Sequence, residues 1–246
     1  MSTKILKPMG VSNPNLLING DFQVWQRGES FTFIGKEEYV YTADRWCVYG
    51  ATGQSIKVDK VAGGLQISGT KQIIQRFEKP LKTGIYYMLS AKINGAIRSL
   101  LITGSNYTSN DFLRYQKAGA YEEIDVFISG TTTIEYVKLE VGALQTKFSP
   151  RLMADEMAMC LRYYECIDNL ICQQYYMNQY IGFNFYPKRS VPTIRLKALS
   201  TQNGSTVQIS NYLETSNNSI RRIIAQDIYQ LGNIIYTDIF LDAEIY

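Results

Sequence analysis

The sequence has no histidine among its 246 residues, and it has only two tryptophans and six prolines. Histidine is the usual base of Ser-His-Asp and Cys-His nucleophilic sites and the commonest zinc ligand. Its absence excludes those classes of catalytic and metal site. Chemistry performed by carboxylates alone is still open, but no catalytic motif is recognisable, and we expect that this chain is not an enzyme.

The cysteines are few, and none forms the C-x-x-C pair of a metal or redox site. Three of them, Cys160, Cys166 and Cys172, recur every six residues, and the fourth is Cys47. The simplest interpretation is that they are small buried thiols. Two disulfides are the alternative, although a chain of this length does not need them. We expect no metal ion and no other cofactor.

Long apolar runs are absent too. No stretch approaches the roughly 20 apolar residues of a transmembrane helix, and residues 1–10 lack the apolar core of a secretory signal. We therefore expect no membrane insertion and synthesis in a cytoplasm. The formal net charge of +3 is too small to favour nucleic acid as a partner.

The residues that are plentiful indicate β-structure. Tyrosine occurs 19 times, and it favours strands and contact surfaces. Apolar and polar residues alternate in 87–93, 124–128 and 134–141, which is the pattern of half-buried strands. Turn signals separate the segments: Ala62-Gly63-Gly64, Lys82-Thr83-Gly84, Asn94-Gly95 and Ser129-Gly130.

The stretch 134–141 shows the alternation most clearly. Its odd positions from 137 to 141 are apolar, and between them stand Lys138 and Glu140. A half-buried strand turns its apolar side chains to the core and its polar side chains to water. We therefore expect Lys138 and Glu140 on a solvated face.

The pattern changes after Pro150. In 152–166, apolar residues fall at the intervals of three and four that describe one face of a helix. Strand-like alternation returns in 180–186, 205–210 and 237–245. The helix therefore marks a boundary between two domains.

The sequence predicts an all-β protein with a short connecting helix. We expect an N-terminal jelly roll or β-sandwich at 15–149, the connecting α-helix within 150–168, and a smaller C-terminal β-sandwich domain at 169–246.

Residues 1–14 have no helix or strand period, because proline and glycine interrupt irregularly spaced apolar residues. We expect them to form an arm that anchors the protein to a partner. The anchoring residues would be Ile5, Leu6, Met9 and Val11.

Both tryptophans lie in short motifs, each beside an arginine or one residue removed from it. The first motif runs from Asn15-Leu16-Leu17-Ile18-Asn19-Gly20-Asp21-Phe22 to Trp25-Gln26-Arg27-Gly28. The second is Tyr41-Thr42-Ala43-Asp44-Arg45-Trp46. Later come Val137-Lys138-Leu139-Glu140-Val141-Gly142, then Phe148-Ser149-Pro150-Arg151, then Cys160-Leu161-Arg162-Tyr163-Tyr164. In this order, over residues 15 to about 165, the chain resembles a family of bacteriophage and prophage tail-fibre or receptor-binding proteins.

The resemblance implies a jelly roll similar to carbohydrate-binding modules at 15–149. It also implies display on a virion, often as a homotrimer, with residues 1–14 attached to other virion proteins. A host surface polysaccharide is then a candidate ligand. Fold does not by itself determine function, so this ligand is an expectation drawn from the likeness.

Two interpretations of the tryptophan motifs are open. In one, both indoles fill the core and their charged neighbours pair at its edge. In the other, one indole is a platform on which a sugar stacks, and charged side chains beside it bind hydroxyl groups. The second interpretation makes these residues the candidate ligand site: Trp25, Arg27, Asp44, Arg45 and Trp46.

Three neighbouring carboxylates, Glu122, Glu123 and Asp125, suggest the acid pair of a glycosidase. Glu123 and Asp125 share one face of a strand, however, and a solvated sheet surface explains them more simply.

Three hypotheses for function follow. The first is a virion structural protein that mediates adhesion to the host surface, through glycans. The alternative is a purely architectural virion adaptor that binds only other virion proteins. The third and weakest is a depolymerase that uses carboxylates alone.

Overall fold

The computed structural model describes residues 12–77, 80–103, 106–118, 121–173, 180–196, 200–201, 208–215, 219–226 and 234–244. The chain divides into two compact units: one comprises Met1–Glu156 with Ile245–Tyr246, and the other is Met157–Glu244. The proposed anchoring residues lie outside the described residues: Ile5, Leu6, Met9 and Val11.

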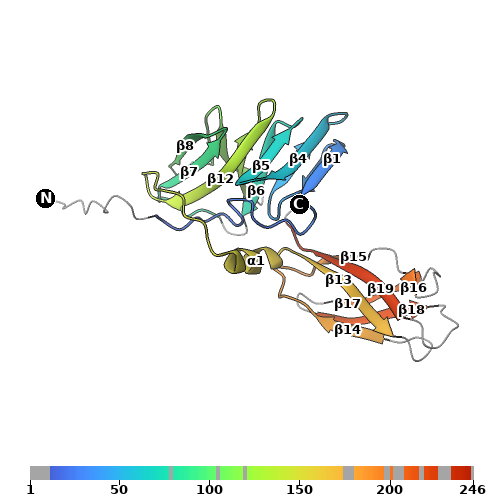
Figure 1. Cartoon of the computed structure of the whole chain (residues 1–246). Helices are drawn as coiled ribbons and strands as arrows, with labels where there is room; N and C mark the ends of the chain where they lie inside the picture. The colour runs from blue at the N-terminus through green and yellow to red at the C-terminus, as the bar shows by residue number, and fades with distance from the viewer. Residues whose placement is uncertain are drawn as a thin grey trace. The chain divides into compact units, whose positions relative to one another are not determined.

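The first unit is a β-sandwich built from two six-stranded antiparallel sheets (Figure 1). One of them, here called the β12 sheet, has the spatial order β1 (Ser30–Ile34), β4 (Ser55–Val61), β5 (Gly64–Ser68), β12 (Thr132–Val141), β7 (Tyr87–Ile93) and β8 (Ala96–Ile102). The other, the β11 sheet, has the order β2 (Glu38–Tyr41), β3 (Cys47–Gly50), β6 (Gln72–Phe77), β11 (Tyr121–Phe127), β10 (Leu113–Ala118) and β9 (Tyr107–Ser109). The predicted all-β sandwich of jelly-roll type is confirmed.

Two-residue turns set the strand register where the sequence signals them. Asn94 and Gly95 join β7 to β8, and both have a positive φ, of 48° and 78°. That geometry matches the twist of a hairpin and favours the Asn-Gly pair. Ala62 and Gly63 also form a two-residue connection, between β4 and β5, in which only Gly63 has a positive φ, of 78°.

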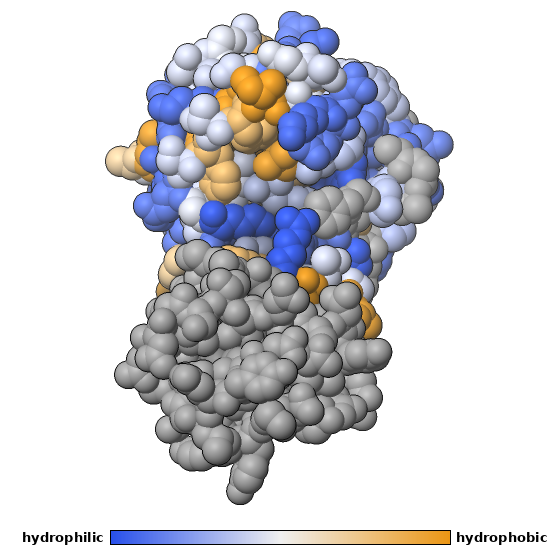
Figure 2. Space-filling view, turned by 90° about the vertical axis from the view of Figure 1, so that its right-hand side faces the viewer, coloured by the Kyte–Doolittle hydropathy of each residue, from blue (hydrophilic) through white to orange (hydrophobic). Residues whose placement is uncertain are grey.

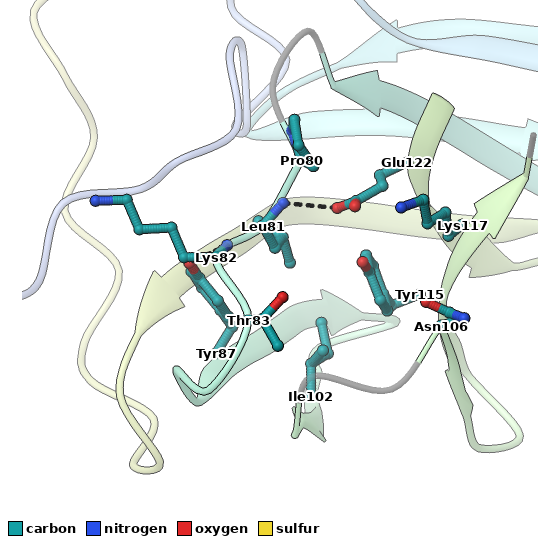
Figure 3. A pocket seen from close by; sticks show the side chains of 10 residues that line it. All are labelled: Pro80, Leu81, Lys82, Thr83, Tyr87, Ile102, Asn106, Tyr115, Lys117 and Glu122. Carbon is teal, nitrogen blue, oxygen red and sulfur yellow. Dashed lines mark hydrogen bonds between the residues drawn. The ribbon is translucent and has the colours of Figure 1, made fainter. Parts of the chain in front are cut away.

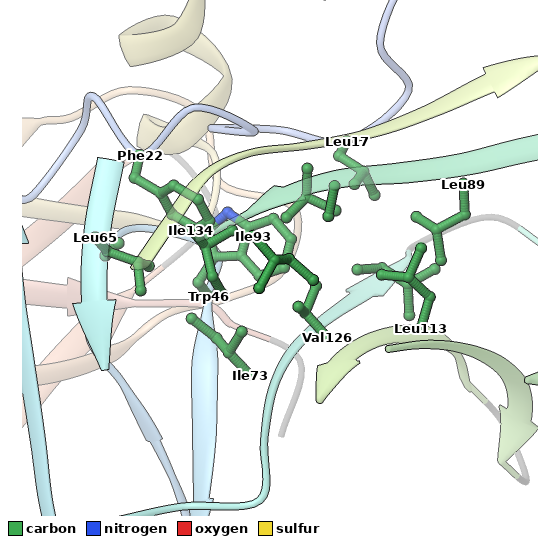
Figure 4. Packing of buried hydrophobic residues seen from close by; sticks show 14 of the residues in the cluster. Leu17, Phe22, Trp46, Leu65, Ile73, Leu89, Ile93, Leu113, Val126 and Ile134 are labelled. Atoms are coloured by element: carbon green, nitrogen blue, oxygen red, sulfur yellow. The ribbon is translucent and has the colours of Figure 1, made fainter. Parts of the chain in front are cut away.

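The core of this unit lies between the two sheets. Leu89 and Val137 of the β12 sheet and Ile73 and Val126 of the β11 sheet belong to one buried cluster (Figure 4). Each of these residues belongs to the set of alternate residues in its strand that face the core. The predicted period-two pattern therefore did identify the core face.

The expectation of a solvated face on β12 is wrong. Lys138 and Glu140 are about 1% and 0% exposed, and they form an ion pair with Nζ to Oε2 at 3.1 Å. The chain after β12 turns back over them: Thr146 donates through its backbone N–H to Glu140 (2.8 Å) and accepts from Lys138 Nζ at Oγ1 (2.6 Å). Ser12, at the end of the expected arm, bonds to the Lys147 carbonyl (2.8 Å). Tertiary packing therefore buries a strand face that looks polar.

The helix α1 (Met153–Leu161) is shorter than predicted. Its first turn carries Asp155 and Glu156, which suits the positive end of the helix dipole. It ends because the chain enters β13 at Tyr164, whose partner on β19 is Asp242. Tyrosines and β-branched residues favour strands, so the apparent helical period of 162–166 was accidental. The change of unit falls within α1, after Glu156.

The second unit is a smaller β-sandwich of antiparallel strands. One sheet contains β13 (Tyr164–Gln173), β19 (Ile234–Asp242), β15 (Thr193–Leu196) and β16 (Ser200–Thr201). The other contains β14 (Tyr180–Asn184), β18 (Ser219–Gln226) and β17 (Gln208–Thr215). The strand expected at 180–186 is β14, and the strand expected at 237–245 is the second half of β19, where Ile239 and Leu241 are buried.

The buried pair of Lys138 and Glu140 makes stability depend on pH. Burial alone would raise the pKa of Glu140, but hydrogen bonds from Thr146 and the charge of Lys138 lower this pKa below its ordinary value. A carboxyl group whose pKa is lower in the folded state than in the unfolded state stabilises the protein fully at pH values above its unfolded pKa, about 4.3. This stabilisation is lost as the pH falls through the folded pKa. We expect Glu140→Gln to lower the free energy of unfolding by about 3 kcal/mol at neutral pH, and by less at about pH 3, as measured by urea titration.

The control is Glu38→Gln, which removes an exposed carboxylate on β2. It should change the free energy of unfolding by less than about 0.5 kcal/mol at either pH. An equal loss for Glu140→Gln at both pH values would contradict the ionic contribution.

Candidate functional site

The structure places both tryptophans in the core of the first unit. Trp46 is about 0% exposed and packs on Phe22 with ring centroids 5.1 Å apart (Figure 4). Trp25 is about 9% exposed, and its Nε1 donates to the Phe22 carbonyl (2.5 Å). A sugar needs an open aromatic face, so the stacking platform proposed for these two indoles is corrected: both have a core role.

The charged residues of the same motifs bind the protein itself. Asp44 is buried and accepts from the backbone N–H of Gln26 (3.0 Å), and its Oδ1 lies 3.7 Å from Arg27 Nη1. Arg45, with a positive φ of 73°, donates through Nη2 to the Arg76 carbonyl (2.6 Å). These contacts hold loops in place, and the motif therefore marks a structural junction.

Asn19 is the centre of that junction. Its side-chain Nδ2 donates to the carbonyls of Val24 and Asp44, both at 2.9 Å, and its Oδ1 accepts from the Val24 N–H (2.9 Å). Its own carbonyl accepts from Trp46 Nε1 (2.8 Å), and its N–H donates to Glu156. One buried asparagine thus connects the first motif, the second motif and the start of α1.

The segment around Asn19 also completes the β12 sheet. Asn15 accepts at Oδ1 from the N–H of Leu139 (2.9 Å) and donates to the Val137 carbonyl (2.9 Å). Gly20 accepts from the Val137 N–H (2.6 Å), and a Cβ on Gly20 would lie only 2.5 Å from the Val137 oxygen. Arg151, of the Phe-Ser-Pro-Arg turn, donates to the Leu17 carbonyl (2.8 Å). The first four motifs of the resemblance, up to the turn that contains Arg151, therefore meet in the first unit.

The carboxylates of β11 divide between two faces. Glu123 and Asp125 lie on the outer face, but they are buried, which corrects the expectation of a solvated surface. Glu123 pairs with Arg76 (Nε to Oε2, 3.0 Å), and Asp125 pairs with Arg114 (2.8 Å). Burial raises the pKa of Asp125 although Arg114 opposes this. Both carboxylates are engaged with arginines, which is a structural use.

Glu122 points the other way, into a cavity of about 190 Å³ at one end of the sandwich (Figure 3). The polar lining residues are Lys82, Thr83, Tyr87, Asn106, Tyr115, Lys117 and Glu122. The apolar lining residues are Pro80, Leu81 and Ile102. They come from the ends of strands of both sheets and from the chain between β6 and β7.

Hydrogen bonds hold one wall of the cavity in place. The N–H of Leu81 donates to Glu122 Oε2 (2.7 Å), and the N–H of Lys82 donates to the Tyr87 hydroxyl (3.0 Å). Tyr115 lies beside Glu122 and bonds to it; burial first, and then this bond, raise the pKa of Tyr115 above its usual range. The Tyr115 hydroxyl donates its one proton to Glu122, and its oxygen can accept a hydrogen bond from a ligand.

Lys117 adds a positive charge opposite Glu122, its cross-strand partner. Figure 3 shows the amine of Lys117 and the hydroxyl of Tyr115 directed toward the part of the cavity where Glu122 lies. Within the described residues, Lys117 Nζ forms no hydrogen bond or ion pair, and Lys117 is exposed to solvent. A ligand in this cavity would meet a cation, a carboxylate, hydroxyl groups and an amide.

Sequence reasoning missed most of this cavity. Glu122 was noticed, but as a member of the carboxylate group with Glu123 and Asp125. Tyr115, Lys117 and Asn106 carry no motif, because four separate chain segments supply the lining. The one available signal was the alternation in β11, which places Glu122 on the face of the core residues Ile124 and Val126.

Within the described residues, no group of histidine, cysteine or acidic side chains could hold a metal ion. Nor does any helix in that part of the chain have the length and apolar character needed to cross a membrane. Comparison with family models, curated proteins and solved structures finds no match. The fold and the cavity therefore define this chain only as a β-sandwich protein with a small cavity lined mainly by polar residues.

The Asn19 junction generates a stability prediction. We expect Asn19→Ala to lower the free energy of unfolding by about 3 kcal/mol or more, measured by chemical denaturation. The substitution leaves buried backbone groups of Val24 and Asp44 without partners, and it puts a less suitable residue at a φ of 55°.

The matched control is Asn94→Ala, because Asn94 also has a positive φ but sits in an exposed turn. It should cost about 1 kcal/mol, from backbone conformation and from loss of the exposed hydrogen bond that the Thr133 N–H donates to Asn94 Oδ1 (2.8 Å). Equal losses for the two variants would show that the buried hydrogen bonds of Asn19 contribute nothing extra.

Proposed function

We propose that this chain is a binding protein whose N-terminal sandwich takes one sugar residue in the cavity beside Glu122. The observation that carries the proposal is the lining: a carboxylate, one lysine amine, two tyrosines, a threonine and an asparagine line the cavity, while the amine of Lys82 is directed away from it (Figure 3). Sugars present many hydroxyl groups, which such donors and acceptors bind in a defined orientation.

The size of the cavity limits the ligand. Pockets for drug-sized molecules are typically about 300–1,000 Å³, and this cavity is about 190 Å³. A single terminal sugar therefore suits it better than a long oligosaccharide. Leu81 and Ile102 offer apolar surface for the C–H face of a ring.

Binding is a better proposal than hydrolysis. Canonical glycosidases use two carboxyl groups on either side of the scissile bond. Glu122 is the one carboxylate among the described residues that line the cavity. Glu123 and Asp125 face away from it and are paired with arginines.

The biological setting rests on the motif resemblance. On that basis we propose a virion structural protein, a short fibre, spike or tail-tip component, that mediates adhesion to host-surface glycans. The alternative is an architectural adaptor that binds other virion proteins alone, in which case the cavity has no glycan to bind.

A glycan array probed with the full chain tests the proposal. We expect selective binding to glycans that end in one kind of sugar, and we expect Lys117→Met to weaken that binding about tenfold, since a lost hydrogen bond to a charged group is worth about 1.5–3 kcal/mol. Affinities can be measured by calorimetry with the best glycan on the array.

The matched control is Lys71→Met, which makes the same chemical change at an exposed residue. Lys71 lies just before β6, and the cavity lies beyond the other end of this strand. Lys71 and the cavity are therefore about 20 Å apart along the strand. Equal weakening by both variants, or no glycan bound at all, would refute the proposed site; the second outcome would favour the architectural alternative.

A further inference from the structure

The edge strand β1 is unusual among the four edges of the first unit. Edge strands are commonly protected from pairing by charge, shortness or cover. β8 carries Arg98, and Asn110 donates to its Ser99 carbonyl (3.0 Å); β9 has three residues, and β2 begins with Glu38. β1 reads Ser-Phe-Thr-Phe-Ile, without charge or proline.

Among the described residues, the hydrogen-bond pattern shows which backbone groups of β1 have no neighbouring strand. Lys60 donates to the Glu29 carbonyl, and Gly35 donates to the Gln54 carbonyl, both at 2.8 Å. In an antiparallel pair, residues alternate between bonding to the neighbour and facing away. Phe31 and Phe33 therefore bond to β4, whereas the N–H and C=O groups of alternate residues face the open edge: Ser30, Thr32 and Ile34.

The two phenylalanines of β1 are placed symmetrically about Thr32. If a second β1 runs antiparallel with Thr32 opposite Thr32, Ser30 meets Ile34 and each Phe31 meets a Phe33. All three open residues then form pairs that exchange both hydrogen bonds, and the phenylalanines fall in the closer, non-hydrogen-bonded positions. Aromatic cross-strand pairs of this kind stabilise sheets.

The same edge carries exposed apolar surface. A groove of about 440 Å³ between the edges of the two sheets is lined by Phe31, Phe33, Ile34 and Val40, with Lys36 and Glu38 at its polar end. Ile34 is 55% exposed. Figure 2 shows an apolar patch on the side of the first unit where β1 runs. A patch of this kind on an edge strand favours a partner strand over water.

We propose that β1 is an interface between two copies of this chain, which pair antiparallel about a twofold axis at Thr32 and join their β12 sheets into one. The contact is isologous, so it closes at two copies. It predicts a dimer, where the family resemblance led us to expect a trimer. The proposal is independent of the ligand in the cavity.

Cysteine cross-linking of the full chain tests the register. Two Thr32→Cys side chains would lie directly opposite, with Cα atoms about 5.5 Å apart, and a short bis-maleimide should join them. The matched control is Ile34→Cys, equally exposed on the same strand, where the two copies are separated by about 14 Å along the strand. We expect cross-linked dimer for Thr32→Cys, and little for Ile34→Cys or for the unsubstituted chain with its native cysteines.

Thr32→Pro tests the hydrogen bonds. Proline removes the N–H that faces the open edge and leaves the bonds to β4 in place, so the fold should survive. Sedimentation over a dilution series should give twice the mass of one chain for the unsubstituted protein and for Thr32→Ala, and the mass of one chain for Thr32→Pro. Circular dichroism verifies that each variant is folded.

Three outcomes would overturn the proposal. The first is a monomer at every concentration, without selective cross-linking at position 32. The second is a trimer whose mass is unchanged by Thr32→Pro. The third is equal cross-linking at positions 32 and 34. None of these results depends on glycan binding, so the interface and the cavity can fail separately.

Discussion

The first unit depends on the buried side chain of Asn19. An asparagine can bind a donor and two acceptors at once, and here those groups belong to loops far apart in the sequence. The carbonyl of the same residue fixes Trp46, the largest fully buried side chain. A buried backbone group that lost its hydrogen bond to Asn19 would lower the stability of the fold, because it would be removed from water without a partner. The N-terminal segment can therefore close the sandwich only with Asn19 in place.

Buried charge is the second constraint. Both outer sheet faces carry ion pairs beneath other parts of the protein: Lys138 with Glu140 on the β12 sheet, and Arg76 with Glu123 on the β11 sheet. Such pairs add little net stability over apolar residues, but breaking one is costly. Arg76 also lies against Tyr39, 4.1 Å from the ring centroid. These contacts bury charged side chains on the outer faces of both sheets.

The fold class and many strand positions could be predicted from local patterns. The alternation in β7 and β12 and the Asn94-Gly95 turn are properties of neighbouring residues, so they are visible in the sequence. The site could not be predicted in this way. The tryptophans suggested a ligand platform, but their exposure depends on which loops cover them. The cavity joins Tyr115 to Glu122 and Tyr87, and only the packing of two sheets brings these residues together.

By itself, the sequence determined that this chain is a β-protein and that histidine chemistry is excluded. These are consequences of residue type and short-range order. The tertiary structure decided which polar residues are buried and where a ligand can enter. The physical reason is that burial depends on contacts between distant segments. Lys138 looks solvated in its strand, yet the turn that contains Thr146 covers it.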